Sequence, residues 1–432
     1  MYISQQIAAI AISNVLAGRN LTLALPDALN AYPAATPQQR GAASDLSYGT
    51  LRFYGEVNAY LVKLLEKPLI NSHINALLLV AIYQLLHDKA DDFTVVNQAV
   101  KAAGEAKPRW AKGLVNGILR NFLRQKDQLV IALKQDEVAI YSYPQWWIAK
   151  LKTQYPNDWA HILGTGNTHP PMSLRVNAKK TSAKEYVQFL SRQAIEAEQV
   201  GEYAVILQQP IPVERIPGFA DGVVSVQDYG AQMAAVLLDL AHDMQVLDAC
   251  CAPGGKTGHI LELAGVHFKG VQLTALDSDA TRLSRVESNL QRLALSAKLI
   301  TADAATFVSP QLFDRILADV PCTASGIVRR HVDIKWLRRE SDIASFCKQQ
   351  AAILANLWQL LAKGGKLLYV TCSIFNEENQ QQIDAFLQKH TDATQLPLLM
   401  TLEHENNIQQ SNGQLIPNNH HDGLFYALLQ KK

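Results

Sequence analysis

The chain has 432 residues, of which 48% are hydrophobic and 18% are charged, and its formal net charge is +1. This composition excludes a disordered or fibrous chain, and the length is enough for about two to four domains. Because the net charge is close to zero, a nucleic-acid partner cannot be inferred from the total, and any phosphate-binding surface has to be local.

Cysteine usage and the apolar segments limit the cellular setting. The five cysteines lie in the C-terminal part: Cys250, Cys251, Cys322, Cys347 and Cys372. They are too few and too unevenly spaced for a disulfide framework, which favours a reducing cytoplasm. The first 20 residues lack the basic start of a signal peptide and predict an amphipathic helix. The most apolar run, Ala76–Leu86, is too short to cross a bilayer, so no membrane association is expected.

Residues 1–140 are predicted to form an all-helical domain. Apolar residues recur at spacings of three and four, which is typical of helices: Ile70, Ile74, Leu77, Leu78, Ala81, Ile82 and Leu85. A further helix is predicted to start at Thr94 as its N-cap, and another at about Arg109. This last helix carries several basic residues, namely Arg109, Lys112, Arg120, Arg124 and Lys126. They form either a solvated face or a contact to an RNA backbone.

Residues 141–226 are predicted to form a small α+β domain. Strands are expected at Met172–Val176, Ala204–Leu207 and Val223–Val226, with a helix over Thr181–Ala197. Three tryptophans near its start are expected in the core or at a domain interface, namely Trp146, Trp147 and Trp159.

Residues 227–432 alternate between strand and helix patterns, which predicts a doubly wound α/β sheet. The expected strands are Gln245–Ala249, Gln272–Leu276, Lys298–Thr301, Arg315–Ala318, Lys366–Val370 and a late strand, Phe425–Leu429. Helices are expected over residues 257–264, 279–293 and 342–362.

The motif VLDACCAPGGKTGHI follows the first of these strands and opens a helix. Gly254 and Gly255 permit a tight turn and a close approach to a nucleotide-like ligand, although the motif is neither a P-loop nor a dinucleotide fingerprint. Asp277 ends the next strand, 277 − 254 = 23 residues after Gly254, where an acidic residue can bind ribose hydroxyls. Asp303 follows the third strand and could accept from an adenine amino group. Taken singly, each aspartate could equally be a turn or capping residue.

Two cysteines and an aspartate follow the next strands of the predicted sheet. Asp319 and Cys322 come just after one strand, and Cys372 just after the next, so all three are expected at the edge that carries the glycine-containing loop. A lone cysteine in such a place is more often a buried structural thiol. Two of them, each flanked by small polar residues, favour nucleophilic chemistry, for which the site must stabilise the thiolate.

The motifs LDACCAPGGK, ALDSD, TADA, DVPCTASG and VTCS occur in this order over about 130 residues, and the series resembles the Sun/Fmu family of RNA 5-methylcytosine methyltransferases. The first 140 residues are similar to a NusB-like helical RNA-binding domain, and PPMSLRVN and GVVSVQDYGAQMAAVLL resemble the family's linker. The segment RRHVDIKWLRR resembles the members that act on bacterial small-subunit rRNA. The fold implied is a NusB-like bundle, a small α+β domain and a Rossmann-like methyltransferase domain with an antiparallel strand at the sheet edge.

The resemblance implies a role for each matching residue. Cys372 would attack carbon 6 of cytosine, Cys322 would assist release of the methylated product, and Asp319 would hydrogen-bond the target base. The cofactor would be S-adenosylmethionine, held by Cys250, Cys251, Ala252, Pro253, Gly254, Gly255, Lys256, Asp277, Asp303 and Asp319. Because DNA cytosine methyltransferases use only the cysteine that follows the proline, the presence of both cysteines indicates RNA. Cys251 and Val332 depart from the family pattern, which usually has alanine and proline there.

The expected partner is 16S rRNA, unassembled or early in assembly, bound by a monomer, with no DNA and no membrane. A basic cluster after the Cys322 loop is either a solvated face or a contact to RNA phosphates, and we favour the contact. It comprises Arg329, Arg330, Lys335, Arg338 and Arg339. Two alternatives remain: a tRNA cytosine-5 methyltransferase, and a non-catalytic NusB-like assembly factor. His420–His421 and Cys250–Cys251 lack metal-ligand spacing, so no metal site is expected.

Overall fold

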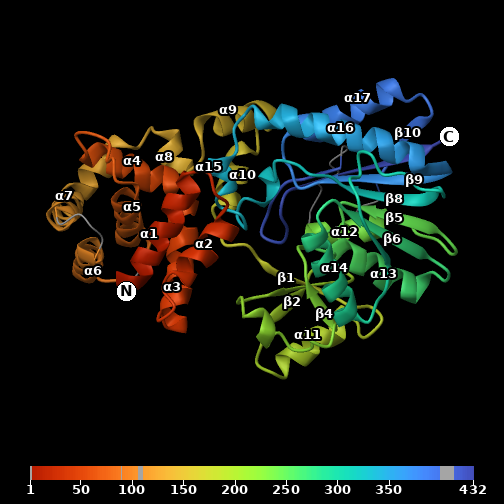
Figure 1. Cartoon of the computed structure of the whole chain (residues 1–432), viewed down its shortest axis with the longest axis horizontal. Helices are drawn as coiled ribbons and strands as arrows, with labels where there is room; N and C mark the ends of the chain where they lie inside the picture. Colours follow the sequence, from red (N-terminus) through yellow and green to blue (C-terminus); the bar gives the residue numbers. More distant parts are fainter. Residues whose placement is uncertain (1, 89, 106–109, 399–412) are drawn as a thin grey trace. The chain divides into compact units, whose positions relative to one another are not determined.

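A computed structural model describes residues 2–88, 90–105, 110–398 and 413–432, and the chain divides into two compact units. Unit 1 comprises residues 1–168 together with 328–340, and unit 2 comprises residues 169–327 and 341–432. Figure 1 shows their helices and strands, with labels where there is room. By their contacts, residues 141–168 and 328–340 group with the helical unit. The two units therefore do not correspond one to one with the three predicted domains.

Unit 1 is helical, as predicted. Its helices are α1 (Tyr2–Leu16), α2 (Leu21–Asn30), α3 (Pro37–Arg52), α4 (Tyr54–Leu64), α5 (Ser72–His87), α6 (Asp92–Glu105), α7 (Ala111–Ala132), α8 (Glu137–Tyr141), α9 (Gln145–Gln154), α10 (Trp159–Gly166) and α15 (Ile334–Leu337). Helix α5 is its central element, because four successive residues, Leu77 to Val80, are fully buried. A helix that is apolar on every side has to be surrounded by other helices.

Some residues of the predicted helices lie elsewhere than expected. Ile70 precedes α5 and is fully exposed, so it is not part of the apolar helix face. The prediction that Thr94 is an N-cap is wrong, because α6 begins at Asp92 and the Asp91 carboxylate accepts the Thr94 N–H at 2.9 Å. Arg109 lies outside the described residues. Trp147 is fully buried, as expected of a core residue.

Unit 2 begins with a small antiparallel sheet of order β2-β3-β1-β4. Its elements are β1 (Met172–Val176), α11 (Ala183–Ser191), β2 (Ala197–Gln199), β3 (Ala204–Leu207), η1 (Val213–Arg215) and β4 (Val224–Val226). Helix α11 starts with a capping box between Ser182 and Glu185 and packs Tyr186 and Leu190 against the sheet. The helix predicted over Thr181–Ala197 is shorter than predicted, because α11 ends at Ser191 and β2 begins at Ala197.

The larger sheet of unit 2 has the order β10-β12-β9-β8-β5-β6-β7, with β11 paired to β12. Its strands are β5 (Gln245–Ala249), β6 (Gln272–Asp277), β7 (Lys298–Thr301), β8 (Phe313–Asp319), β9 (Leu361–Thr371), β10 (Ala393–Leu396), β11 (Gln414–Leu415) and β12 (Leu424–Lys431). The connecting elements are α12 (Tyr229–Leu237), α13 (Gly255–His267), α14 (Ala280–Leu293), η2 (Ser325–Ile327), α16 (Asp342–Leu360), η3 (Asn376–Glu378) and α17 (Gln380–Lys389). The predicted strands and helices of the doubly wound sheet are thus confirmed.

Helices cover both faces of this sheet (Figure 1). On β5, Leu247 packs in the cluster that contains Trp358 of α16, and the adjacent Val246 packs with Ile260 of α13. This explains why the strands are apolar at successive positions. Strand β12 runs antiparallel to β9, as predicted, but β10 pairs with its other side, so β12 is not the outermost strand. None of the helices within the described ranges is long and apolar enough to cross a membrane.

The strand order reverses between β5 and β8. From β5 the chain proceeds to β6 and β7 on one side, and then returns to place β8 and β9 on the other. Loops at the carboxyl ends of strands on either side of such a reversal diverge and leave a crevice for ligands. The predicted site residues follow these strands.

Candidate active site

The loop after β5 is sharply bent before it opens α13. Cys250 and Gly254 have left-handed backbone conformations, with φ of 61° and 94°. A Cβ on Gly254 would lie 3.0 Å from Cγ1 of Val286 and 3.2 Å from its Cα, so both the conformation and the packing against α14 require glycine. A Cβ on Gly255 would meet nothing closer than 3.7 Å. The loop is thus less crowded at Gly255 than at Gly254, and it leads directly into the N-terminus of α13, where backbone N–H groups favour anions.

The predicted cofactor aspartates have turn contacts in the structure. Asp277 is buried, and its two carboxylate oxygens accept the N–H groups of Ala252 (3.2 Å) and Asp279 (3.0 Å). Asp277 therefore ties the bent loop to the end of β6. Asp303 is exposed and accepts the Ala305 N–H at 2.9 Å. Both aspartates lie after the expected strands, and the structure gives each a local structural role, which leaves ligand contact as a proposal.

The two predicted thiols are in contact. The Sγ atoms of Cys322, after β8, and Cys372, after β9, lie 3.4 Å apart. Cys322 is buried and Cys372 is half-buried. The hydrogen bond with Cys372, burial, and the nearby Glu378 carboxylate together raise the pKa of Cys322 well above its ordinary value. The thiol form of Cys322 is thereby favoured. The pKa of Cys250 is likewise raised, to about 12, chiefly by burial, so its thiol form is also favoured.

An ion pair lies beside the thiols. Lys256 Nζ donates to Asp319 Oδ2 at 2.6 Å, which joins the start of α13 to the end of β8. Burial alone would lower the pKa of Lys256, but the Asp319 carboxylate and electrostatic interaction with Cys372 outweigh it and raise the pKa. The Lys256 side chain therefore carries its positive charge within electrostatic range of the Cys372 sulfur. A cation in this place is what a reactive thiolate requires.

Three buried polar residues next to the site were not predicted. Glu378 is fully buried and accepts hydrogen bonds from the residues that follow both thiols. Arg175 is fully buried and donates to the carbonyl oxygen of Gly255 at 2.6 Å. Asp248, near the end of β5, has its pKa raised to about 7 by burial. In the sequence the only signal for each is a charged residue within an otherwise apolar or small-residue motif, which does not reveal its partner.

The basic cluster after the Cys322 loop divides into buried and accessible residues. Arg329 and Lys335 are buried in unit 1, and Lys335 Nζ donates to the Arg52 carbonyl oxygen and the Asn167 side chain, both at 2.7 Å. Burial, with Arg52 nearby, lowers the pKa of Lys335 well below its ordinary value. Because both side chains are buried in the structure, the expectation that Arg329 and Lys335 bind phosphate is revised. Arg330 and Arg338 are half-buried and Arg339 is exposed.

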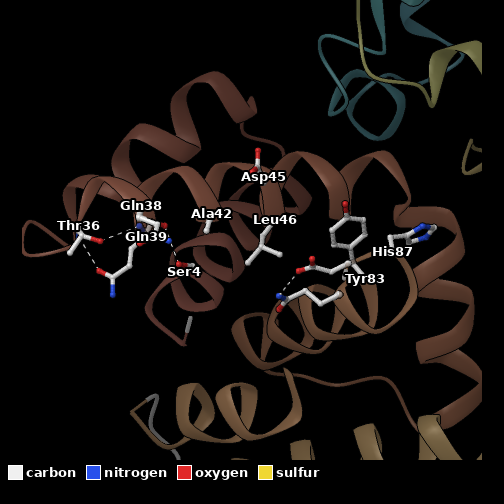
Figure 2. Close-up of a pocket in the computed structure, with 11 residues that line it drawn as sticks. Ser4, Thr36, Gln38, Gln39, Ala42, Asp45, Leu46, Tyr83 and His87 are labelled. Carbon is white, nitrogen blue, oxygen red and sulfur yellow. Dashed lines mark hydrogen bonds between the residues drawn. The ribbon is translucent and has the colours of Figure 1, made fainter. Parts of the chain in front are cut away.

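Two cavities among the described residues of unit 1 differ in chemistry. One has a volume of about 570 Å³ and is lined by residues of α1, α3 and α5, among them Asp45, Tyr83 and His87, which Figure 2 draws as sticks. A groove of about 680 Å³ lies between α6 and α7 and is lined by Phe93, Val96, Asn97, Val100, Asn116, Gly117, Arg120, Leu123 and Arg124. This second groove contains an exposed aromatic ring and two exposed arginines, and the described residues that line it include no acid. Its chemistry therefore suits an anionic ligand with flat rings.

Metal-binding clusters of three or more suitable side chains are absent from the described part of the chain. His421 is buried, with its Nδ1 at 2.8 Å from the Asp422 carbonyl oxygen and its Nε2 at 3.0 Å from Nδ2 of Asn418. Both ring nitrogens thus have protein partners that order the turn before β12.

Comparisons with known proteins cover the whole chain. The family model of the 16S rRNA methyltransferase RsmB/F matches residues 235–430, that of the RsmF/B-like ferredoxin-like domain matches 143–214, and that of the NusB family matches 3–124. Ribosomal RNA small subunit methyltransferase B of Pseudomonas syringae pv. tomato is 40% identical over 435 residues, which covers 98% of this chain and 96% of that protein.

Two further similarities agree with this result. The protein of the same name from Serratia proteamaculans is 40% identical over 439 residues, and the alignment covers 100% of this chain and 99% of that protein. The crystal structure of PH0851 has a TM-score of 0.79 at 22% identity and covers 99% of both chains. At this identity, the structural likeness supports the fold alone.

Proposed function

Because the chain belongs to the RsmB/F family of 16S rRNA methyltransferases, we propose that it methylates carbon 5 of a cytosine in 16S rRNA through a covalent bond between Cys372 and carbon 6. The carrying observation is the contact between the Cys322 and Cys372 sulfurs, 3.4 Å apart, beside the Lys256–Asp319 ion pair. A non-catalytic assembly factor has no need of this arrangement. The names of the relatives favour small-subunit rRNA over tRNA.

The residues of the bent loop fit S-adenosylmethionine, the methyl donor of the family. When bound, this cofactor supplies an electrophilic methyl group on its sulfonium. The backbone N–H groups at the start of α13 can receive the donor's carboxylate, since helix N-termini favour anions. The exposed Asp303 is available to an adenine amino group, and Asp277 stabilises the bent loop by accepting the Ala252 N–H. We assign the loop residues Cys250 to Lys256 to cofactor binding on this basis.

Cys372 acts as the nucleophile in this proposal. Its thiolate forms a bond to carbon 6, which converts the ring to an enamine whose carbon 5 can accept the methyl group. Lys256 stabilises negative charge at the site, and Asp319 hydrogen-bonds the polar edge of the base. After methyl transfer, carbon 5 loses its proton to a general base, the electron pair re-forms the ring double bond, and the bond from sulfur to carbon 6 breaks.

Cys322 assists this last step. Its pKa is raised well above the ordinary value, so it is a thiol and can donate a hydrogen bond. The leaving group of the elimination is the Cys372 thiolate, which lies in contact with it. Hydrogen bonding to the developing thiolate lowers the barrier to release. Loss of Cys322 should therefore trap the enzyme on its RNA rather than prevent attack.

We propose that RNA contacts are made by Arg330, Arg338 and Arg339 and by the groove between α6 and α7. In that groove the exposed ring of Phe93 can stack on an unpaired base, while Arg120 and Arg124 contact phosphates. A target base has to leave its stack to reach the thiols. Free or early-assembly 16S rRNA, bound by one copy of the chain, meets this requirement.

Bisulfite sequencing tests the proposed reaction. Ribosomal and transfer RNA from cells that lack the gene are incubated with the purified protein and S-adenosylmethionine. One new 5-methylcytosine in 16S rRNA is expected, with none in tRNA. Modification of tRNA alone would refute the substrate, and methylation detected by mass spectrometry at another base or ring atom would refute the chemistry.

A further inference from the structure

The two thiols belong to different loops, and their contact depends on how those loops are held. Cys322 follows β8, and Cys372 follows the adjacent parallel strand β9. Adjacent strands lie about 4.8 Å apart, so strand pairing brings the loops near each other without fixing the distance between two sulfurs. Thiols held at 3.4 Å need a further link between the loops.

One buried carboxylate provides this link. Glu378 Oε1 accepts the backbone N–H of Thr323 at 2.8 Å, and Oε2 accepts the Thr323 hydroxyl at 2.5 Å. The same Oε2 accepts the hydroxyl of Ser373, also at 2.5 Å. Thr323 directly follows Cys322, and Ser373 directly follows Cys372. Glu378 thus bonds to the next residue after each thiol.

A second set of hydrogen bonds closes the connection. The hydroxyls of Ser325 and Ser373 lie 2.9 Å apart, and Ser325 Oγ accepts the backbone N–H of Ile374 at 2.9 Å. The backbone carbonyl of Cys372 accepts the N–H of Gly326 at 2.8 Å. These bonds join the same two loops beside the contacts that Glu378 makes.

The burial of Glu378 indicates that this link has a use beyond packing. Its side chain is fully buried, and burial raises its pKa. The partners named above are neutral, and so is Gln350, whose amide donates to Oε1 at 3.1 Å. A buried carboxylate without a paired cation is costly, and an apolar residue of similar size often serves stability better. Three donors from the two loops, the Thr323 N–H and the hydroxyls of Thr323 and Ser373, offset part of the cost of burying this carboxylate. The carboxylate therefore serves to position the loops.

We propose that Glu378 is a positioning residue that holds the Cys322 and Cys372 thiols in contact by clamping their two loops. This inference rests on the proposed function for the meaning of that contact, but the clamp itself can be tested without RNA. Glu378 touches neither sulfur, and its negative charge also contributes to keeping Cys322 in the thiol form. The contact between the sulfurs and the thiol form of Cys322 both suit a pair in which Cys372 attacks and Cys322 donates a hydrogen bond to it.

Two variants separate the clamp from general stability. Glu378→Leu removes every acceptor while keeping the site filled. Glu378→Gln keeps one carbonyl oxygen for the Thr323 N–H and offers an amide to the two hydroxyls, so it should preserve the link. The matched control is Glu287→Leu, because Glu287 is exposed on α14 of the same unit.

The first readout is the distance between the thiols. Dibromobimane becomes fluorescent when it bridges two thiols, and peptide mass spectrometry identifies the bridged pair. Wild type, Glu378→Gln and Glu287→Leu should yield a Cys322–Cys372 bridge, and Glu378→Leu should lose it while each thiol still reacts singly. Equal bridging in Glu378→Leu would overturn the proposal.

The second readout is turnover. Because displacement of a reacting group by about 1 Å can cost about 100-fold, kcat of Glu378→Leu should fall about 100-fold, with the KM for S-adenosylmethionine within about twofold. Glu378→Gln should restore most of the activity, and an unrestored Gln variant with normal bridging would contradict positioning. If Glu378→Leu does not fold, Thr323→Val and Ser373→Ala each remove one hydroxyl donor and should reduce bridging. If the wild type forms the Cys322–Cys372 bridge but has no methyltransferase activity, the proposed function is refuted and the positioning role of Glu378 is not.

Discussion

Arg175 is expected to be essential for the stability of unit 2. It lies on β1 of the small sheet, and its guanidinium donates to both carboxylate oxygens of Glu262 on α13, at 2.9 Å and 2.7 Å. The two side chains are 0% and 1% exposed. Arg175 also donates to the Gln227 side chain and to the Gly255 carbonyl oxygen. One cation therefore ties the small sheet to the helix that begins at the bent loop.

Arg175→Met removes this cation and leaves the Glu262 carboxylate buried without it. Breaking a buried pair in this way costs about 3–5 kcal/mol of unfolding free energy, whereas replacing both partners by apolar residues is often neutral. The double variant Arg175→Met/Glu262→Leu should therefore recover most of the loss. Urea denaturation of the three proteins measures these differences, and calorimetry should show weaker S-adenosylmethionine binding for the single variant. A single variant that loses less than about 1 kcal/mol, or a double variant less stable than the single one, refutes this reasoning.

Three other changes test the charges of the molecule. Burial raises the pKa of Asp248 from 3.8 to about 7, so its contribution to stability is fully present below about pH 4 and is lost as pH rises to about 7. Asp248→Asn should flatten this dependence in urea titrations between about pH 4 and pH 7. Arg330→Glu with Arg339→Glu should weaken RNA binding in filter-binding assays at least tenfold or so without changing cofactor affinity, and an equal loss of both would indicate a folding defect. Arg120→Glu with Arg124→Glu should lower RNA affinity and the salt dependence of binding, whereas an unchanged salt dependence would exclude the α6–α7 groove.

The sequence predicted the elements of unit 2 well because their patterns are local. A buried parallel strand such as β5 is a short apolar run, and the glycine residues that follow it indicate where the loop begins. Asp319, Cys322 and Cys372 could therefore be placed at one edge of the sheet before any distance was known. The strand order was not predicted, because the right-handed rule for crossovers fixes the face on which a connecting helix lies and not the order of the strands.

Contacts that depend on distant parts of the chain were not predictable in this way. The segment that contains Arg329 and Lys335 reads as a basic surface loop, and its burial depends on Arg52 and Asn167, which are far away in sequence. The role of Glu378 likewise depends on Thr323, 55 residues earlier. The end of α11 was missed for a related reason. Strand β2 is held by pairing with β3 rather than by its own residues.

The order of the two thiols in the reaction is tested most directly by trapping the covalent intermediate. Each cysteine is replaced by alanine, and each variant is incubated with 16S rRNA and S-adenosylmethionine and run on a denaturing gel. Cys322→Ala should accumulate a slowly migrating protein–RNA adduct, because attack by Cys372 proceeds and release fails. Cys372→Ala should form no adduct and transfer no methyl group. An adduct with Cys372→Ala and none with Cys322→Ala would show that the roles of the two sulfurs are reversed.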